Sequence, residues 1–160
     1  SNTRTLADDK SGATLQQLLT DDGHVLADRK IVRDDIPSIR GVVETWIADP
    51  TIDVVITTGG TGFTGHDVTP EAVRPLFEKE IDGFSIVFHM LSFQKIETST
   101  IQSRACGGLA RGTYIFCLPG SPGACRDGWT GILKWQLNNQ HRPCNFVEIM
   151  PRLEEHRRGG

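Results

Sequence analysis

The sequence predicts an α/β domain in three layers, in which a mostly parallel sheet lies between two layers of helices. Two runs, IDVVITT at residues 52–58 and TYIFCL at residues 113–118, are dominated by apolar residues without a period of two. Strands of this kind are buried on both faces, which is typical of parallel sheets covered by helices on each side. Each run leads into a loop rich in glycine and then into a helix, which is the alternation of the α/β class.

The first elements are expected to be a helix, a strand and a second helix. Leucines at helical spacing lie between Ser11, a candidate N-cap, and Gly23, a candidate stop signal. Residues 25–32 alternate imperfectly between apolar and polar side chains, which predicts a strand near a sheet edge. Residues 36–47 repeat apolar side chains every three to four positions, so a helix is predicted there that ends before Pro50.

The later elements follow the same reasoning. Thr69 is the candidate N-cap of a helix after the first glycine loop, and another helix is expected after Gly83. A last helix is expected over residues 129–137. A chain of 160 residues predicts one domain, over residues 1–150, and the polar end at residues 151–160 predicts a flexible tail.

One element of this fold class has no counterpart in the sequence. Such a fold usually opens with a buried strand, and the polar residues 1–10 cannot supply one. The expectation is therefore either that the chain begins just after that strand or that its sheet has one strand fewer.

Composition excludes several classes of function. The formal net charge of −3 gives no general attraction to nucleic acid or to an anionic membrane. No apolar stretch approaches the roughly 20 residues needed to cross a bilayer, and the polar start is unlike a signal peptide. The 4 cysteines have neither CxxC nor zinc-site spacing, which indicates buried reduced thiols and a cytoplasmic protein.

The two glycine loops are the candidate binding elements. Residues 59–62 and 119–123 both follow an apolar strand and precede a helix, so both lie at the carboxyl ends of strands, where ligands bind in such sheets. Their amides would favour an anion, and threonine and serine hydroxyls could add donors. The loop GGTG matches neither the dinucleotide fingerprint nor the Walker loop. The alternative is that these glycines only make tight turns.

Two aspartates are the candidate catalytic residues. Asp67 follows the first glycine loop, and Asp34 lies with Asp35 at the end of the strand expected before it. Carboxylates from two strand ends beside a phosphate cradle suit a reaction of a magnesium-bound nucleotide. The alternative is structural, because Asp67 could stabilise a helix N-terminus and either Asp34 or Asp35 could be a helix cap.

The order of several motifs resembles one known family. TTGGTG with DVTPEA, and LPGSPGA, occur with DGF, MLSF, TS and SRA between them. This combination closely resembles the MoaB/MogA family of molybdenum cofactor biosynthesis, from Ser1 to about Asn145, and MLSFQKIETSTIQSRA and HRPCNF resemble its MoaB branch. The resemblance implies a MoCF-type (MogA-like) α/β fold and a homotrimer or hexamer.

The resemblance also implies a reaction. Active members bind molybdopterin, a pterin dithiolene with a phosphate, and use Mg²⁺ and ATP to adenylylate that phosphate, so an adenylyltransferase-like enzyme is expected. A molybdate-insertion protein is then an expected partner, with no nucleic acid and no membrane involved. Two other functions stay open: a non-catalytic carrier of molybdopterin, and a nucleotide pyrophosphatase of the competence-damage type, which has a related fold.

Family positions carry over residue by residue. Asp67 and Asp34 match the two functional aspartates, and Asp67 is the expected Mg²⁺ ligand. Asn2 stands where the family has aspartate, and asparagine lacks the charge of a metal ligand. The expected substrate- and nucleotide-binding residues are Thr58, Gly59, Gly60, Thr61, Gly62, Gly120, Ser121 and Pro122.

Overall fold

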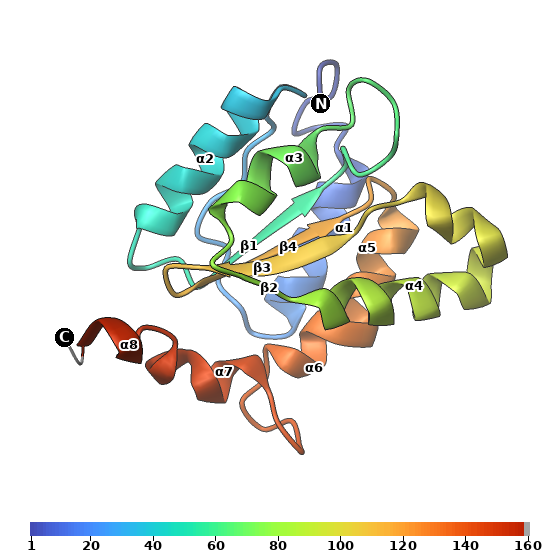
Figure 1. Cartoon of the computed structure of the whole chain (residues 1–160). Helices are drawn as coiled ribbons and strands as arrows, with labels where there is room; N and C mark the ends of the chain where they lie inside the picture. The colour runs from blue at the N-terminus through green and yellow to red at the C-terminus, as the bar shows by residue number, and fades with distance from the viewer. Residues whose placement is uncertain (159–160) are drawn as a thin grey trace.

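The sheet confirms the predicted α/β class. The computed structural model describes residues 1–158, and within them the strand order is β1–β4–β3–β2 (Figure 1). β1 is parallel to β4, whereas β3 is antiparallel to both β4 and β2, so every strand except β3 runs in one direction. The strands are β1 (Val54–Thr58), β2 (Lys79–Glu80), β3 (Cys106–Ala110) and β4 (Thr113–Leu118).

β4 shows why its sequence does not alternate. Every residue of this strand is buried, because helices cover both faces. Tyr114, Phe116 and Leu118 point into one apolar cluster, and Ile115 and Cys117 point into the other. The continuous apolar run is therefore a strand at the centre of a three-layer structure, as predicted.

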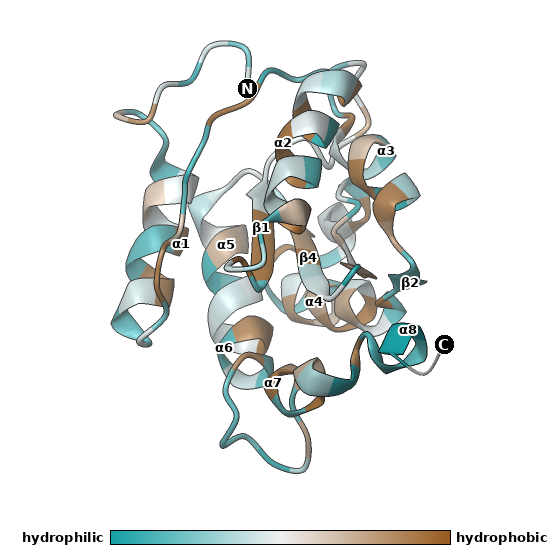
Figure 2. Ribbon diagram, turned by 90° about the vertical axis from the view of Figure 1, so that its left-hand side faces the viewer, coloured by the Kyte–Doolittle hydropathy of each residue, from teal (hydrophilic) through white to brown (hydrophobic). Residues whose placement is uncertain are grey.

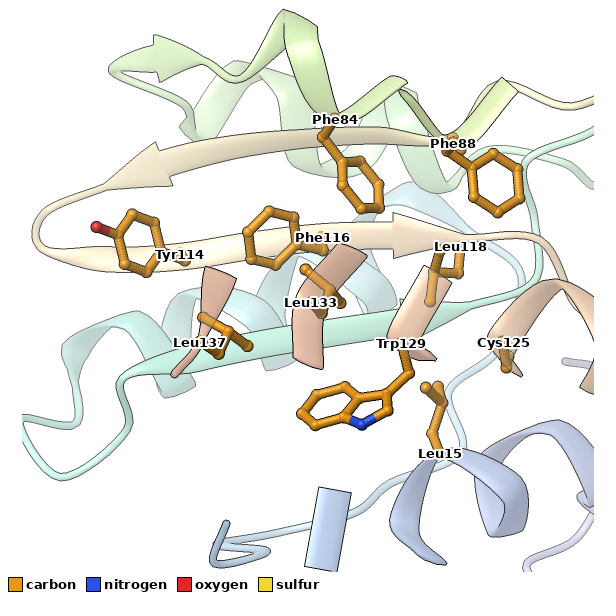
Figure 3. Packing of buried hydrophobic residues seen from close by; sticks show 11 residues of the cluster. Leu15, Phe84, Phe88, Tyr114, Phe116, Leu118, Cys125, Trp129, Leu133 and Leu137 are labelled. Carbon is orange, nitrogen blue, oxygen red and sulfur yellow. The ribbon is translucent and has the colours of Figure 1, made fainter. Parts of the chain in front are cut away.

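One layer of helices consists of α1 (Lys10–Asp21), α4 (Asp82–Ile96) and α5 (Pro122–Gly128). α5 continues through a π-helical turn, Trp129–Leu133, into α6 (Lys134–Gln136). Figure 3 shows Phe84 of α4 beside Phe116 and Phe88 nearer Leu118, with Leu133 and Trp129 along the same face of β4. This layer holds the larger aromatic side chains of the core.

The opposite layer consists of α2 (Ile36–Ala48) and α3 (Thr69–Val73), which continues into a 3-10 turn, Arg74–Leu76. The buried face of α2 carries Ile39, Val43 and Ile47. Asp35 caps α2, because its carboxylate accepts a hydrogen bond of 2.7 Å from the amide of Ser38.

The carboxyl-terminal residues pack against the domain. A 3-10 segment (Glu97–Gln102) follows α4, and α7 (Phe146–Ile149), a 3-10 turn (Met150–Arg152) and α8 (Glu155–Arg158) end the described chain. Arg157 forms ion pairs of 2.6 Å with both Glu78 and Glu154. The expected flexible tail, residues 151–160, thus includes helical turns and these ion pairs, and residues 159–160 lie outside the described residues. No helix within residues 1–158 has the length and apolar content to cross a membrane.

The strand predicted over residues 25–32 is wrong. These residues run as extended chain beside α1 (Figure 2) and form no ladder. The side chain of Val25 is 89% exposed. A hollow of about 540 Å³ separates the segment from β1 and is lined by both. The segment lacks a hydrogen-bonding neighbour at the spacing of a sheet, so its alternation does not become a strand.

Three other expectations about local structure also need correction. The sequence does not predict β3, because CGGLA lacks strand-forming side chains. Glycine is required at position 108, since a Cβ there would lie 2.2 Å from the ring of Phe77. The N-cap of α1 is Asp9 instead of Ser11. α3 begins after Val68 without a side-chain cap, and Thr69 is its first residue.

Candidate functional site

The two glycine loops are joined at the carboxyl ends of β1 and β4. The amide of Gly59 donates to the carbonyl of Leu118 at 2.9 Å, and the hydroxyl of Thr58 donates to the carbonyl of Pro119 at 3.0 Å. A Cβ on Gly120 would lie 3.1 Å from the Cα of Gly59. The loops therefore meet backbone to backbone, as the strand order requires.

The first loop needs glycine for its conformation. Gly59 and Gly60 have φ of 98° and 70°, in the left-handed region. A Cβ on Gly60 would lie 2.2 Å from the hydroxyl of Thr69, which itself donates to the carbonyl of Gly59 at 3.1 Å. The amide of Thr69 also donates to Gly60 at 3.0 Å, so the first turn of α3 fixes the loop.

Arg104, which the sequence analysis did not single out, clamps this loop from the start of β3. Its guanidinium donates to the carbonyl of Gly62 at 2.8 and 3.1 Å and to that of Asp67 at 3.0 Å. Its amide donates to the carbonyl of Thr61 at 2.9 Å, and a third guanidinium nitrogen pairs with the carboxylate of Glu71. The signal in the sequence is the arginine of the SRA motif.

The clamp determines where the loop amides point. In a trans peptide the N–H lies opposite the preceding C=O, so the carbonyls of Gly62 and Asp67, which are turned toward Arg104, direct the next amides, of Phe63 and Val68, away from it. Several loop amides have no hydrogen-bond acceptor within residues 1–158. They are Gly60, Thr61, Phe63, Gly65, His66, Val68, Gly120 and Ser121. Unpaired amides at two adjoining glycine loops are donors that an anion such as phosphate can use, and we refer to these amides as the amide cradle.

Asp67 borders this cradle. One of its carboxylate oxygens, Oδ2, accepts hydrogen bonds from the amide and hydroxyl of Thr64 at 2.9 and 2.7 Å. The Thr64 side chain holds the pKa of Asp67 below its ordinary value, so the carboxylate is ionised at neutral pH. The backbone amide of Gly62 also helps to lower the pKa of this carboxylate. Asp67 forms no capping hydrogen bond with α3.

Asp34 occupies a different place. Its carboxylate pairs with the amino group of Ser1 at 2.9 Å, and its amide donates to the side chain of Asn2 at 3.1 Å. Asp35 is the helix cap, which leaves Asp34 as the unassigned carboxylate of the pair. Asp34 lines the same hollow as Thr58 and Gly59, so it borders the site without touching Asp67.

The hydroxyls expected as ligand donors have structural bonds. The hydroxyl of Thr58 donates its hydrogen bond to the carbonyl of Pro119, and the buried hydroxyl of Thr61 lies 3.4 Å from that of Ser103. Ser121 accepts from the amide of Ala124 at 3.1 Å as the N-cap of α5, and its own proton remains free to donate. Pro122 occupies the first turn of α5, where it suits the helix.

The residues fit a magnesium ion bound together with phosphate. The described residues contain no cluster of three or more side chains that would hold a metal by themselves. Mg²⁺ usually binds one or two carboxylates together with substrate phosphates and water, however. Asp67, an ionised carboxylate at the glycine loop, matches this arrangement.

The chain has similar proteins of known family. The family described as "Probable molybdopterin binding domain" matches residues 2–139. Molybdenum cofactor biosynthesis protein B of Escherichia coli K12 is 49% identical over 146 residues, covering 91% of this chain and 86% of that protein. The protein of the same name from Bacillus cereus is 46% identical over 140 residues, covering 87% and 83%.

Solved structures agree with the sequence comparison. A crystal structure of molybdenum cofactor biosynthesis protein B has a TM-score of 0.86 and 39% identity, covering 97% of this chain and 91% of that chain. The similarity thus extends through the strands and both loops of the candidate site. The chain belongs to the MoaB/MogA family of molybdenum cofactor biosynthesis proteins.

Proposed function

We propose that this protein acts in molybdenum cofactor biosynthesis by binding molybdopterin and transferring an adenylyl group from ATP to its phosphate. The observation that carries the proposal is the cradle of unpaired amides at two adjoining loops, bordered by the ionised Asp67. Family membership supports the choice of molybdopterin as substrate.

The chain itself supplies positioning and charge. The amides of the two loops hold phosphate oxygens, so an oxygen of the pterin phosphate lies in line with the α-phosphorus of ATP. That oxygen forms the new bond to phosphorus, and pyrophosphate leaves. Mg²⁺, when bound at Asp67, screens the negative charge of the phosphates. No covalent nucleophile from the protein is required.

Asp34 is proposed as the second functional carboxylate. It borders the hollow that reaches Thr58 and Gly59, at the edge of the cradle. Its partners in the structure are the amino group of Ser1 and the side chain of Asn2. A carboxylate at this edge suits a hydrogen bond to the N–H groups of a heterocycle.

The proposal includes assembly into a homotrimer or hexamer in the cytoplasm. α4 exposes apolar side chains that solvent does not favour: Ile86 and Met90 are 61% exposed and Phe93 is 54% exposed. Together with His89 they line a shallow depression that a second copy of the chain can cover. A molybdate-insertion protein is the proposed receiver of the adenylylated product, and the free thiols suit a reducing compartment.

The experiment combines the purified protein with molybdopterin, ATP and Mg²⁺ and follows adenylylated pterin by mass spectrometry. Asp67→Asn should abolish product while retaining pterin binding, both measured well below the unfolding midpoint of the variant. Asp53→Asn is the matched control, because Asp53 is exposed and immediately precedes β1, at the end opposite the loops. Pterin binding without product in the natural chain would establish the carrier function instead.

A further inference from the structure

Two cysteines oppose each other directly in the sheet. Cys106 of β3 and Cys117 of β4 are register partners, and both side chains are fully buried. The carbonyls of Gly107 and Leu109 accept hydrogen bonds on the β2 side of the strand. Because backbone groups alternate in direction along a strand, the N–H and C=O of Cys106 point toward β4. Residues paired in this way have Cα atoms about 5.5 Å apart, within the spacing of about 4.4–6.8 Å found in disulfides.

The two neighbouring thiols shift each other's pKa. The Cys106 thiol, together with burial, raises the pKa of Cys117 well above its ordinary value. The Cys117 thiol lowers the pKa of Cys106, so Cys106 loses its proton before Cys117 does. A nucleophilic thiolate beside a protonated thiol is the arrangement that disulfide formation requires.

The other cysteines lack such a partner. Cys125 is buried, and burial raises its pKa to about 11. Its sulfur lies 3.3 Å from the hydroxyl of Thr58. Cys144 is exposed and distant in sequence from the sheet. Within residues 1–158, Cys106 and Cys117 are therefore the cysteines placed as a dithiol.

We propose that Cys106 and Cys117 form a redox-active dithiol that hydrogen peroxide converts into an intramolecular disulfide. The Cys106 thiolate attacks one peroxide oxygen, an S–O bond forms, the O–O bond breaks, and the released hydroxide takes a proton to become water. The Cys117 thiol then attacks the resulting sulfenic acid, and a second water leaves as the S–S bond forms. The two thiols supply the two electrons and two protons that reduce peroxide to water.

Both thiols are fully buried, and a bond from the amide of Ile81 to the carbonyl of Gly107 covers β3 up to the residue next to Cys106. Peroxide therefore reaches Cys106 through a local opening of the structure that does not unfold the domain. Peroxide is small enough to use such an opening. The inference is independent of the proposed enzyme reaction.

The experiment treats the folded full chain with hydrogen peroxide, blocks remaining thiols with N-ethylmaleimide in denaturant, and maps tryptic peptides by mass spectrometry. Residues 105–111 should appear linked to residues 112–126, and dithiothreitol should separate them. The second peptide contains both Cys117 and Cys125, and fragmentation distinguishes them.

Variants and denaturant complete the test. Cys125→Ala should retain the link, and Cys117→Ala should lose it; if Cys117→Ala fails to fold, fragmentation of the natural chain decides the partner. Links to Cys125 or Cys144 in the natural chain would overturn the proposal. So would a link that forms only at urea concentrations that unfold the chain, monitored by circular dichroism.

Discussion

Replacing Arg104 with methionine removes the guanidinium from the first glycine loop and keeps a side chain of similar length. The carbonyl of Gly62 loses bonds of 2.8 and 3.1 Å, and that of Asp67 loses one of 3.0 Å. The ion pair with Glu71 is lost as well. The prediction is that the loop loses both stability and the fixed direction of its amides.

The magnitude follows from these contacts. Hydrogen bonds that involve a charged group contribute about 1.5–3 kcal/mol each, but water can replace part of this at a surface loop. The Glu71 side chain is 44% exposed, so its ion pair adds only about 0–1 kcal/mol. We expect the free energy of unfolding to fall by about 2–3 kcal/mol. For a chain of this size that corresponds to a midpoint lower by roughly 5–10 °C.

The effect on binding follows from the population of the correct loop conformation. If the amides converge in only about a tenth of the folded molecules, the apparent affinity for a phosphate ligand falls about 10-fold. Isothermal titration with Mg-ATP measures this affinity, and urea unfolding measures the stability. Binding is measured well below the unfolding midpoint, so that the two losses are separate.

Arg74→Met is the matched control. Arg74 pairs with Glu80 at 3.2 Å, and both side chains are substantially exposed, so about 0–1 kcal/mol is expected. Equal effects of the two substitutions would refute the reasoning about the clamp. Unchanged Mg-ATP affinity in Arg104→Met would show that the amides keep their direction without it.

Three further predictions concern single positions. Gly60→Ala should lower the free energy of unfolding by about 1–3 kcal/mol in urea titrations, since φ is 70° and the new Cβ meets a hydroxyl of α3 at 2.2 Å; the same change at Gly41, in open helical space, should not destabilise the chain. Thr64 lowers the pKa of Asp67, so the Asp67 carboxylate contributes stability above its unfolded pKa, and this contribution is lost as pH falls through the folded pKa. In Thr64→Val, the free energy of unfolding should therefore fall less between neutral and acid pH in urea titrations. An unchanged pH profile would contradict this prediction. Tyr114→Phe loses a bond of 2.7 Å to a backbone carbonyl of α7 and should cost about 1 kcal/mol, with faster hydrogen exchange in α7; unaltered exchange there would count against it.

The elements that the sequence predicts well are those whose signals are local. β4 is recognisable because every side chain contacts a helix layer, which removes the alternation from its sequence. The end of α2 before Pro50 and its start at Asp35 follow from residues within one turn of the helix. The sequence also places both glycine loops correctly, because a strand followed by glycine and a helix is a local pattern.

The elements that the sequence predicts poorly depend on distant neighbours. Residues 25–32 have the alternation of a strand but lie across a hollow from β1. β3 has almost no strand propensity, and it forms because β4 pairs with it along its whole length. In both cases the deciding factor is the presence or absence of a neighbouring backbone at hydrogen-bonding distance.

The same distinction applies to the site. The glycines of the first loop indicate that the backbone can approach a ligand, but they do not determine which way its amides face. That direction depends on Arg104, whose bonds to Gly62 join residues 42 positions apart. A GGTG loop without such a clamp is free to turn its carbonyls toward the ligand and would then repel phosphate. An arginine that contacts the loop from a distant part of the sequence therefore distinguishes an anion-binding GGTG loop from one that only makes a turn. The sequence signal for this function is the presence of both motifs, GGTG and SRA.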